Sequence, residues 1–297
     1  DSMAIHIALW SETFDNVQKG FQLLDRIIEQ GTHHQILTAG YFVANLDNEI
    51  LRQTAARKVL KNHRQRYDIL AVYLPSFLPY PRNMVSKMIN AQAYPEVKHY
   101  FDDNEEAKEF CDWLFDVFQS MKKKELEYSP CIFPWYAVSL KKSELIEKSM
   151  ILAGAMMDQE RIDKLCPYIV DCEANCRDIH FTMMTMGKKT PAVRKAVIDC
   201  MQDKSFDTRQ AAFKCANGME LSAEENRQVE EMLRLRYDDL RRNGMELLMK
   251  QSDDDLQASI RRLLASSKTT MRTAGLDMVT QLHKSKDRGA VAEGCMD

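Results

Sequence analysis

The chain has little glycine and proline, with 10 and 8 residues respectively among 297. Because both residues disfavour regular helix, their scarcity favours a mostly helical protein. No segment shows sustained alternation of apolar and polar residues, so we expect no β-strands. Hydrophobic residues make up 45% of the sequence, which is enough to bury a sizeable core and argues against wholesale disorder.

A strong excess of one charge is also missing. The chain carries 41 basic and 44 acidic residues, for a formal net charge of −3. General binders of nucleic acid or of anionic membranes usually have a basic excess, so the composition disfavours both classes. The longest clean apolar stretch, residues 150–157, is far too short to span a bilayer. We therefore expect no membrane partner and keep nucleic acid as an alternative.

The eight cysteines are scattered along the chain rather than spaced as a disulfide framework. The first residues show no signal-peptide pattern, so we expect reduced thiols and a cytoplasmic location. The start at Asp1-Ser2-Met3 favours a piece of a larger protein.

What the sequence does contain is a recurring helical phrase: an arginine, a small residue three places on and an apolar residue four places later. The clearest copies are Arg209 with Ala212 and Ala216, Arg241 with Gly244 and Leu248, and Arg272 with Gly275 and Val279. The arginines are 32 and 31 residues apart, a period typical of stacked helical hairpins. A related copy occurs at residues 52–59.

Together with Ala-Val-Arg-Lys-Ala-Val at 192–197, these copies resemble HEAT-like (armadillo-type) repeats over residues 190–283 and, less closely, 14–73. The resemblance implies an all-α fold, a right-handed α–α superhelix, whose repeat arginines bond between neighbouring repeats. We expect helical repeats over 1–73 and HEAT-like repeats over 141–297, in one continuous solenoid. Capping residues, among them Thr32, Thr190, Ser222 and Ser252, mark the expected helix starts.

An irregular elaboration is expected between the two repeat regions, over residues 74–140. Prolines make the segments 74–81 and 128–136 unsuitable for regular helix, and the second is rich in aromatic residues.

A metal site is conceivable at Cys166, Cys172, Cys176 and His180, because thiolates and imidazoles are the usual zinc ligands. The last three fall on one face of a helix expected over 171–185. Eight helical residues span about 12 Å, however, and zinc ligands lie roughly 2.3 Å from the ion, so these three cannot share one. A pair from this face together with Cys166 or a distant residue stays conceivable. Buried thiols are the favoured interpretation, and we expect no metal ligands.

Nucleotide-binding, hydrolase and kinase motifs are absent, so we expect no cofactor and no catalytic residues. The leading hypothesis is a non-catalytic protein-interaction scaffold, or a scaffold module of a larger protein. It would bind an extended protein or peptide on its concave surface. The expected binding residues are Arg227, Arg234, Arg261, Arg262, Phe133, Trp135 and Tyr136.

Two alternatives remain open. One is a HEAT-like nucleic-acid-binding or DNA-repair protein of the glycosylase type, with Trp113 and Asp116 as one candidate pair and the aromatic residues Trp135 and Tyr136 as another. The other is a metal-dependent enzyme that uses Cys172, Cys176 or His180.

Overall fold

The computed structural model describes residues 2–79, 97, 100–128, 137–285 and 288–295. The chain is mostly helical and divides into two compact units, residues 1–186 and 187–297. The elements of the first unit are α1 (Ser2–Asp15), α2 (Val17–Gln30), α3 (His33–Ala44), α4 (Glu49–Asn62), α5 (Tyr67–Phe77), α7 (Asn104–Ser120), β1 (Glu125–Tyr128), β2 (Val138–Lys141), α8 (Lys142–Ala155), α9 (Gln159–Leu165), the 3₁₀ helices η2 (Cys166–Asp171) and η3 (Ala174–Cys176), and α10 (Arg177–Met186).

Helix α8 forms the core of the second half of this unit. Residues 145–155 are all buried, and α7, α9, α10 and η2 pack around the helix. The burial extends to polar residues: Lys148 is fully buried, with its Nζ 2.8 Å from Glu144 Oε1 and 3.1 Å from the Pro79 carbonyl oxygen. Side chains on every face of α8 are therefore held away from solvent.

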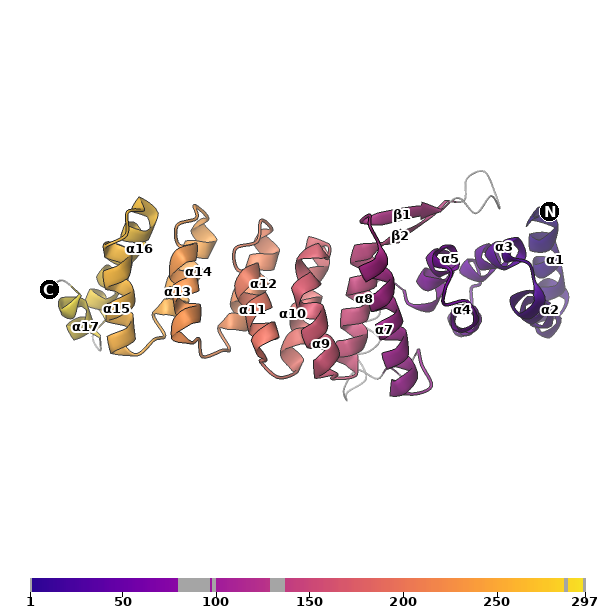
Figure 1. The fold of residues 1–297 in the computed structure, drawn as a ribbon, viewed down its shortest axis with the longest axis horizontal. Helices are drawn as coiled ribbons and strands as arrows, with labels where there is room; N and C mark the ends of the chain where they lie inside the picture. Colours follow the sequence, from indigo (N-terminus) through magenta and orange to yellow (C-terminus); the bar gives the residue numbers. More distant parts are fainter. Residues whose placement is uncertain (1, 80–96, 98–99, 129–136, 286–287, 296–297) are drawn as a thin grey trace. The chain divides into compact units, whose positions relative to one another are not determined.

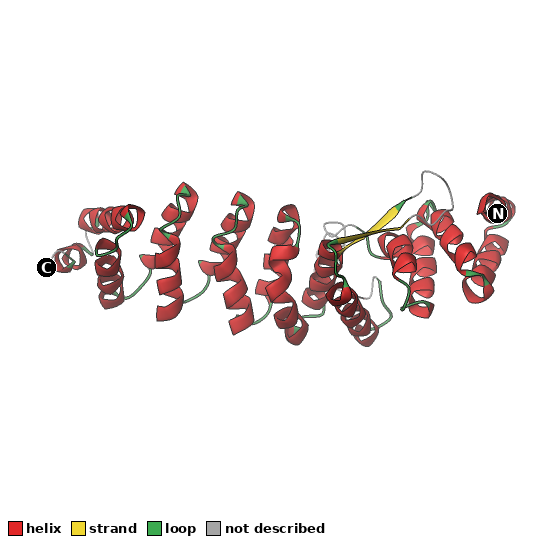
Figure 2. Cartoon of the chain, turned by 45° about the horizontal axis from the view of Figure 1, so that its top comes forward, coloured by secondary structure: helices red, strands yellow, loops and turns green. Residues whose placement is uncertain are grey.

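Two expectations for residues 74–140 are wrong. The structure contains a two-stranded antiparallel sheet, in which Glu125 of β1 pairs with Lys141 of β2 (Figure 2). Each strand has only four residues, too few to give a clear alternating pattern. Helix α5 also continues to Phe77 through Pro75. Proline is tolerated there because the ring faces solvent and only one helical hydrogen bond is lost.

The second unit consists of helix pairs that follow one another along the chain (Figure 1). Its helices are α11 (Pro191–Cys200), α12 (Phe206–Ala216), α13 (Ala223–Met232), α14 (Asp238–Leu248), α15 (Asp253–Leu264), α16 (Thr269–Lys284) and α17 (Gly289–Gly294). Helices α11, α13 and α15 pack in sequence on one another, and so do α12, α14 and α16. We call these the odd row and the even row.

The predicted N-caps are confirmed. Thr32 and Ser222 each form a reciprocal capping box, with Gln35 and Glu225 respectively. The side chains of Thr190 and Ser252 accept hydrogen bonds from backbone N–H groups in the first turns of α11 and α15. These bonds satisfy amide donors that have no partner inside the helix, which fixes where each helix begins.

The repeated arginines occupy equivalent places, each at the fourth residue of its helix. Three of them, Arg52, Arg209 and Arg272, donate from Nη1 to the carbonyl oxygen six residues earlier, at 2.8–2.9 Å. Arg209 also forms a bidentate ion pair with Asp239 on the next even-row helix, with both N–O distances 2.8 Å. These arginines therefore stabilise helix junctions.

Glycine in the phrase permits close helix packing. A Cβ atom on Gly244 would lie 3.0 Å from Leu233 Cδ2, and one on Gly275 would lie 3.1 Å from Leu264 Cδ2. Both distances are tighter than ordinary van der Waals contact, so a side chain at either position would require the neighbouring leucine to shift.

Candidate functional site

A groove of about 630 Å³ runs between α11 and α13 of the odd row. The apolar side chains of Pro191, Ile198 and Met232 contribute to its lining. Most of the other lining residues are charged, four basic and four acidic: Arg194, Lys195, Arg227, Arg234, Asp199, Glu224, Glu225 and Glu231. The groove therefore combines apolar lining with balanced charge.

Half of these charges are already paired inside the chain. Arg194 donates to both carboxylate oxygens of Glu225 across the two helices, and Lys195 lies 2.7 Å from Asp199. The Arg194 contact lowers the pKa of Glu225, chiefly through the hydrogen bond. The Arg194–Glu225 pair links the two walls of the groove, whereas Lys195 and Asp199 both belong to α11.

The other four charges in the groove have no ion pair among the described residues: Arg227, Arg234, Glu224 and Glu231. All four are exposed. They are therefore the groove residues available to a partner, and two of them are arginines expected from the sequence to bind it.

The other two expected arginines, on α15, contact the chain itself. Arg262 forms a bidentate ion pair with Glu230 of α13, at 2.9 and 2.7 Å, and the Glu230 side chain is only 6% exposed. Arg261 donates to the Gly294 carbonyl oxygen. Their role in partner binding stays a prediction. Phe133, Trp135 and Tyr136 lie outside the described residues.

A second pocket, of about 360 Å³, lies in the first unit between α7 and the start of α5. Trp113 and Asp116 line it together with Tyr67 and Arg64. The Arg64 guanidinium lies 3.3 Å from Glu109. The structure thus places the first aromatic and acidic pair considered above in one pocket beside a cation.

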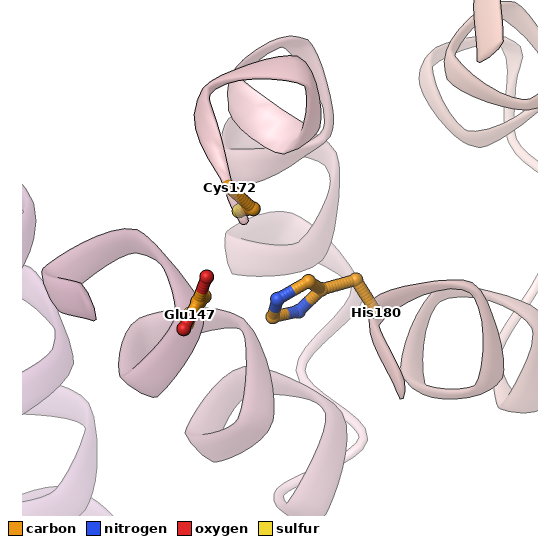
Figure 3. A group of neighbouring side chains, drawn as sticks. All are labelled: Glu147, Cys172 and His180. Carbon is orange, nitrogen blue, oxygen red and sulfur yellow. The ribbon is translucent and has the colours of Figure 1, made fainter. Parts of the chain in front are cut away.

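The most concentrated set of reactive side chains is buried in the first unit. Glu147 of α8, Cys172 at the end of η2 and His180 of α10 point toward a common space (Figure 3). One ligand atom from each lies within 4.8 Å of the other two. Within the described residues, neither ring nitrogen of the fully buried His180 has a hydrogen-bond partner. Leaving such a group unsatisfied costs about 1–3 kcal/mol.

Burial keeps this cluster close to neutral. Desolvation lowers the pKa of His180 to about 3 and raises the pKa of Cys172 well above its ordinary value. It also raises the pKa of Glu147 to about 7, against the opposing effect of a 2.9 Å hydrogen bond from the Glu173 N–H. The imidazole is therefore neutral, which is the form that binds metals.

The predicted helix over 171–185 is wrong in its first part. Cys172 lies in a turn, Cys176 ends η3, and α10 begins only at Arg177. Cys172 can approach His180 because the chain between them is not a continuous helix. Glu147 was not considered from the sequence, where it stands beside other charged residues of the same helix, Glu144 and Lys148.

No helix among the described residues is both long enough and apolar enough to cross a membrane. The fold and its sites define a mostly helical protein with a charged groove and a buried cluster of potential metal ligands. A family model matches residues 1–297, and the chain therefore belongs to the family described as "Family of unknown function (DUF5724)". No curated protein and no solved structure matches the chain.

Proposed function

We propose that this chain is a non-catalytic protein-interaction scaffold, alone or as a module of a larger protein. Its binding surface is the groove between α11 and α13, and its partner is an extended peptide segment. The observation that supports this proposal is the apolar lining of the groove together with two arginines and two glutamates that form no ion pair among the described residues. A peptide offers both charges and apolar side chains at regular spacing.

The proposal includes a right-handed superhelix of HEAT-like hairpins. Supporting it, Arg209 of α12 pairs with Asp239 of α14, and Arg262 of α15 pairs with Glu230 of α13. Each pair links neighbouring helices of one row, as an interaction between successive repeats would. In such a superhelix the odd row lines the concave surface.

Balanced charge favours a peptide over nucleic acid in this groove. A groove that follows a phosphate backbone needs a basic excess, whereas this lining has four charges of each sign. The proposal also assigns the protein to the cytoplasm, where its buried thiols, such as Cys111 and Cys200, would remain reduced.

The test is a selection of extended peptides from a random display library on the immobilised full chain. Enriched peptides are then measured by fluorescence anisotropy against a charge-reversed double variant, Arg227→Glu with Arg234→Glu. Loss of two charge-assisted contacts weakens binding at least about tenfold, since each is worth roughly 1.5–3 kcal/mol when formed.

Arg242→Glu is the matched control, because Arg242 is an exposed arginine on α14 outside the groove. We expect its affinity for the selected peptides to equal that of the wild type. All three proteins should melt at similar temperatures, since Arg227, Arg234 and Arg242 form no described ion pair. Peptides that bind the double variant as tightly as the wild type would contradict the groove assignment.

A second candidate function, a HEAT-like DNA-repair protein, is favoured by one observation. Trp113, Asp116, Tyr67 and Arg64 line one pocket and offer an aromatic surface, a carboxylate and a cation. Release of a modified base from an oligonucleotide by the wild type, with loss of that activity in Asp116→Asn, would support it. Absence of DNA binding at low salt would eliminate it.

A further inference from the structure

The buried cluster in the first unit has a polar group for which the described part of the chain supplies no partner. His180 is completely buried, and neither ring nitrogen is hydrogen-bonded within the described residues. The ring extends toward the carboxyl group of Glu147 and lies near the sulfur of Cys172 (Figure 3). A buried imidazole, thiol and carboxyl group converging from three elements form the donor set of a metal site.

We propose that Glu147, Cys172 and His180 bind a Zn²⁺ ion. Sulfur, nitrogen and oxygen donors together match zinc, which accepts all three. Calcium and magnesium prefer oxygen ligands throughout, so a thiolate and an imidazole select against them. The site is independent of the proposed peptide groove, because all three ligands belong to the first unit.

The geometry is close to that of a bound site. Around a tetrahedral zinc ion the three ligand atoms would lie roughly 3.3–3.6 Å apart. In the structure they lie within 4.8 Å of one another, so an approach of about 1 Å closes the site. Three protein ligands leave the fourth position for a water molecule.

A small pocket lies beside the cluster, at Cys172. It has a volume of about 140 Å³ and is lined by Cys172 together with Asp171, Glu173, Lys142, Lys124 and Ser143. The pocket is large enough for several water molecules and lies next to the residue that carries the thiol.

Neighbouring groups orient two of the ligands. The Glu173 N–H donates to Glu147 Oε1 at 2.9 Å, which leaves Oε2 for the metal. Arg177 donates from Nε to the Cys172 carbonyl oxygen at 3.1 Å and from Nη2 to the Val170 carbonyl oxygen at 2.8 Å. These bonds hold the turn that carries the thiol, as partners around metal ligands commonly do.

The experiment titrates the full chain, after metal removal, with Zn²⁺ in competition with a chromophoric chelator. Cobalt replaces zinc in a parallel titration, because a thiolate ligand gives a cobalt charge-transfer absorption. We expect one equivalent of zinc, a cobalt–thiolate band and a higher melting temperature with metal than without it. Wild-type protein that binds no stoichiometric zinc would overturn the proposal.

Cys172→Ser is compared with Cys111→Ser, which makes the same change at another buried thiol. Cys111 on α7 donates to the Ser149 carbonyl oxygen and lies outside the cluster. Removal of a ligand should weaken zinc binding at least about 100-fold and abolish the cobalt band in Cys172→Ser only. Equal affinity in the two variants would refute the site.

Glu147→Gln keeps the proposal testable should Cys172→Ser fail to fold. The amide preserves the size of the carboxyl group but is a much poorer zinc ligand. We expect a similar loss of zinc affinity with the cobalt–thiolate band weakened, and unchanged affinity in this variant would also refute the site.

Discussion

Replacing Arg209 with alanine tests whether the repeated arginines hold the second unit together. The Arg209 side chain is 5% exposed and forms two 2.8 Å contacts with Asp239, which is itself 12% exposed. It also donates to the Asp203 and Lys204 carbonyl oxygens, and its guanidinium lies 4.3 Å from the centre of the Tyr237 ring. Truncation leaves a largely buried carboxylate, 12% exposed, and two carbonyl groups without this partner.

Breaking a buried ion pair from one side costs about 3–5 kcal/mol. With a slope of about 1–3 kcal/mol per molar urea, the urea midpoint should fall by at least about 1 M. All three tryptophans precede residue 187, so their fluorescence reports on the first unit while far-ultraviolet circular dichroism reports on both. The dichroism midpoint should therefore fall more than the fluorescence midpoint.

Arg272→Ala is the matched control. Arg272 also donates to the carbonyl oxygen six residues earlier, but it forms no ion pair among the described residues, so its loss should cost only about 1 kcal/mol. Arg209→Met combined with Asp239→Leu should recover most of the lost stability, because no buried charge is then unpaired. A cost for Arg209→Ala equal to that of Arg272→Ala would refute the ion pair's structural role.

Three further outcomes follow from local contacts. The hydrogen bond from Arg209 lowers the pKa of Asp239 in the folded state below its ordinary value of 3.8. The ionised carboxylate therefore stabilises the fold above about pH 4, and this contribution is lost as pH falls through the folded pKa. Urea midpoints should consequently fall less steeply between pH 6 and pH 3 for Asp239→Asn than for the wild type. Gly40→Ala should destabilise by about 1–3 kcal/mol in thermal melts, since its Cβ would clash with Val72 Cγ1, and Val72→Ala should relieve part of the clash. Ser222→Ala should lower the free energy of unfolding by about 1 kcal/mol in urea titrations, because it removes the cap of α13.

Helix starts were predictable because they depend on local chemistry. Thr32 and Ser222 each accept a hydrogen bond from a backbone N–H three residues on, so the signal and its cause lie within one turn. Alanine takes the same position in two other copies of the phrase, as Ala55 and Ala212, which agrees with the close packing at Gly244 and Gly275. Pro75 shows the limit of such rules: one residue was read as a helix stop, although its solvent-facing position permits the helix to continue.

The groove could be predicted only in part. Arg227 lies on the exposed face of α13, and Arg234 lies in the turn that follows this helix. Arg262 differs from these two arginines because it pairs with Glu230, a buried carboxylate on the neighbouring helix. The sequence presents all of them as exposed helical arginines, and only packing between helices distinguishes those that are paired.

The exclusion of a shared ion at Cys172 and His180 assumed a continuous helix that the structure does not contain. Eight residues of continuous helix do separate their ends by about 12 Å, which excludes a shared ion. Between Cys172 and Cys176, however, the chain turns, and the helix that carries His180 starts at Arg177. The ligand atoms of Cys172 and His180 can then lie within 4.8 Å of each other and of Glu147. Because Glu147 is 25 residues before Cys172, only the packing of α8 against η2 and α10 could bring the third group into this set.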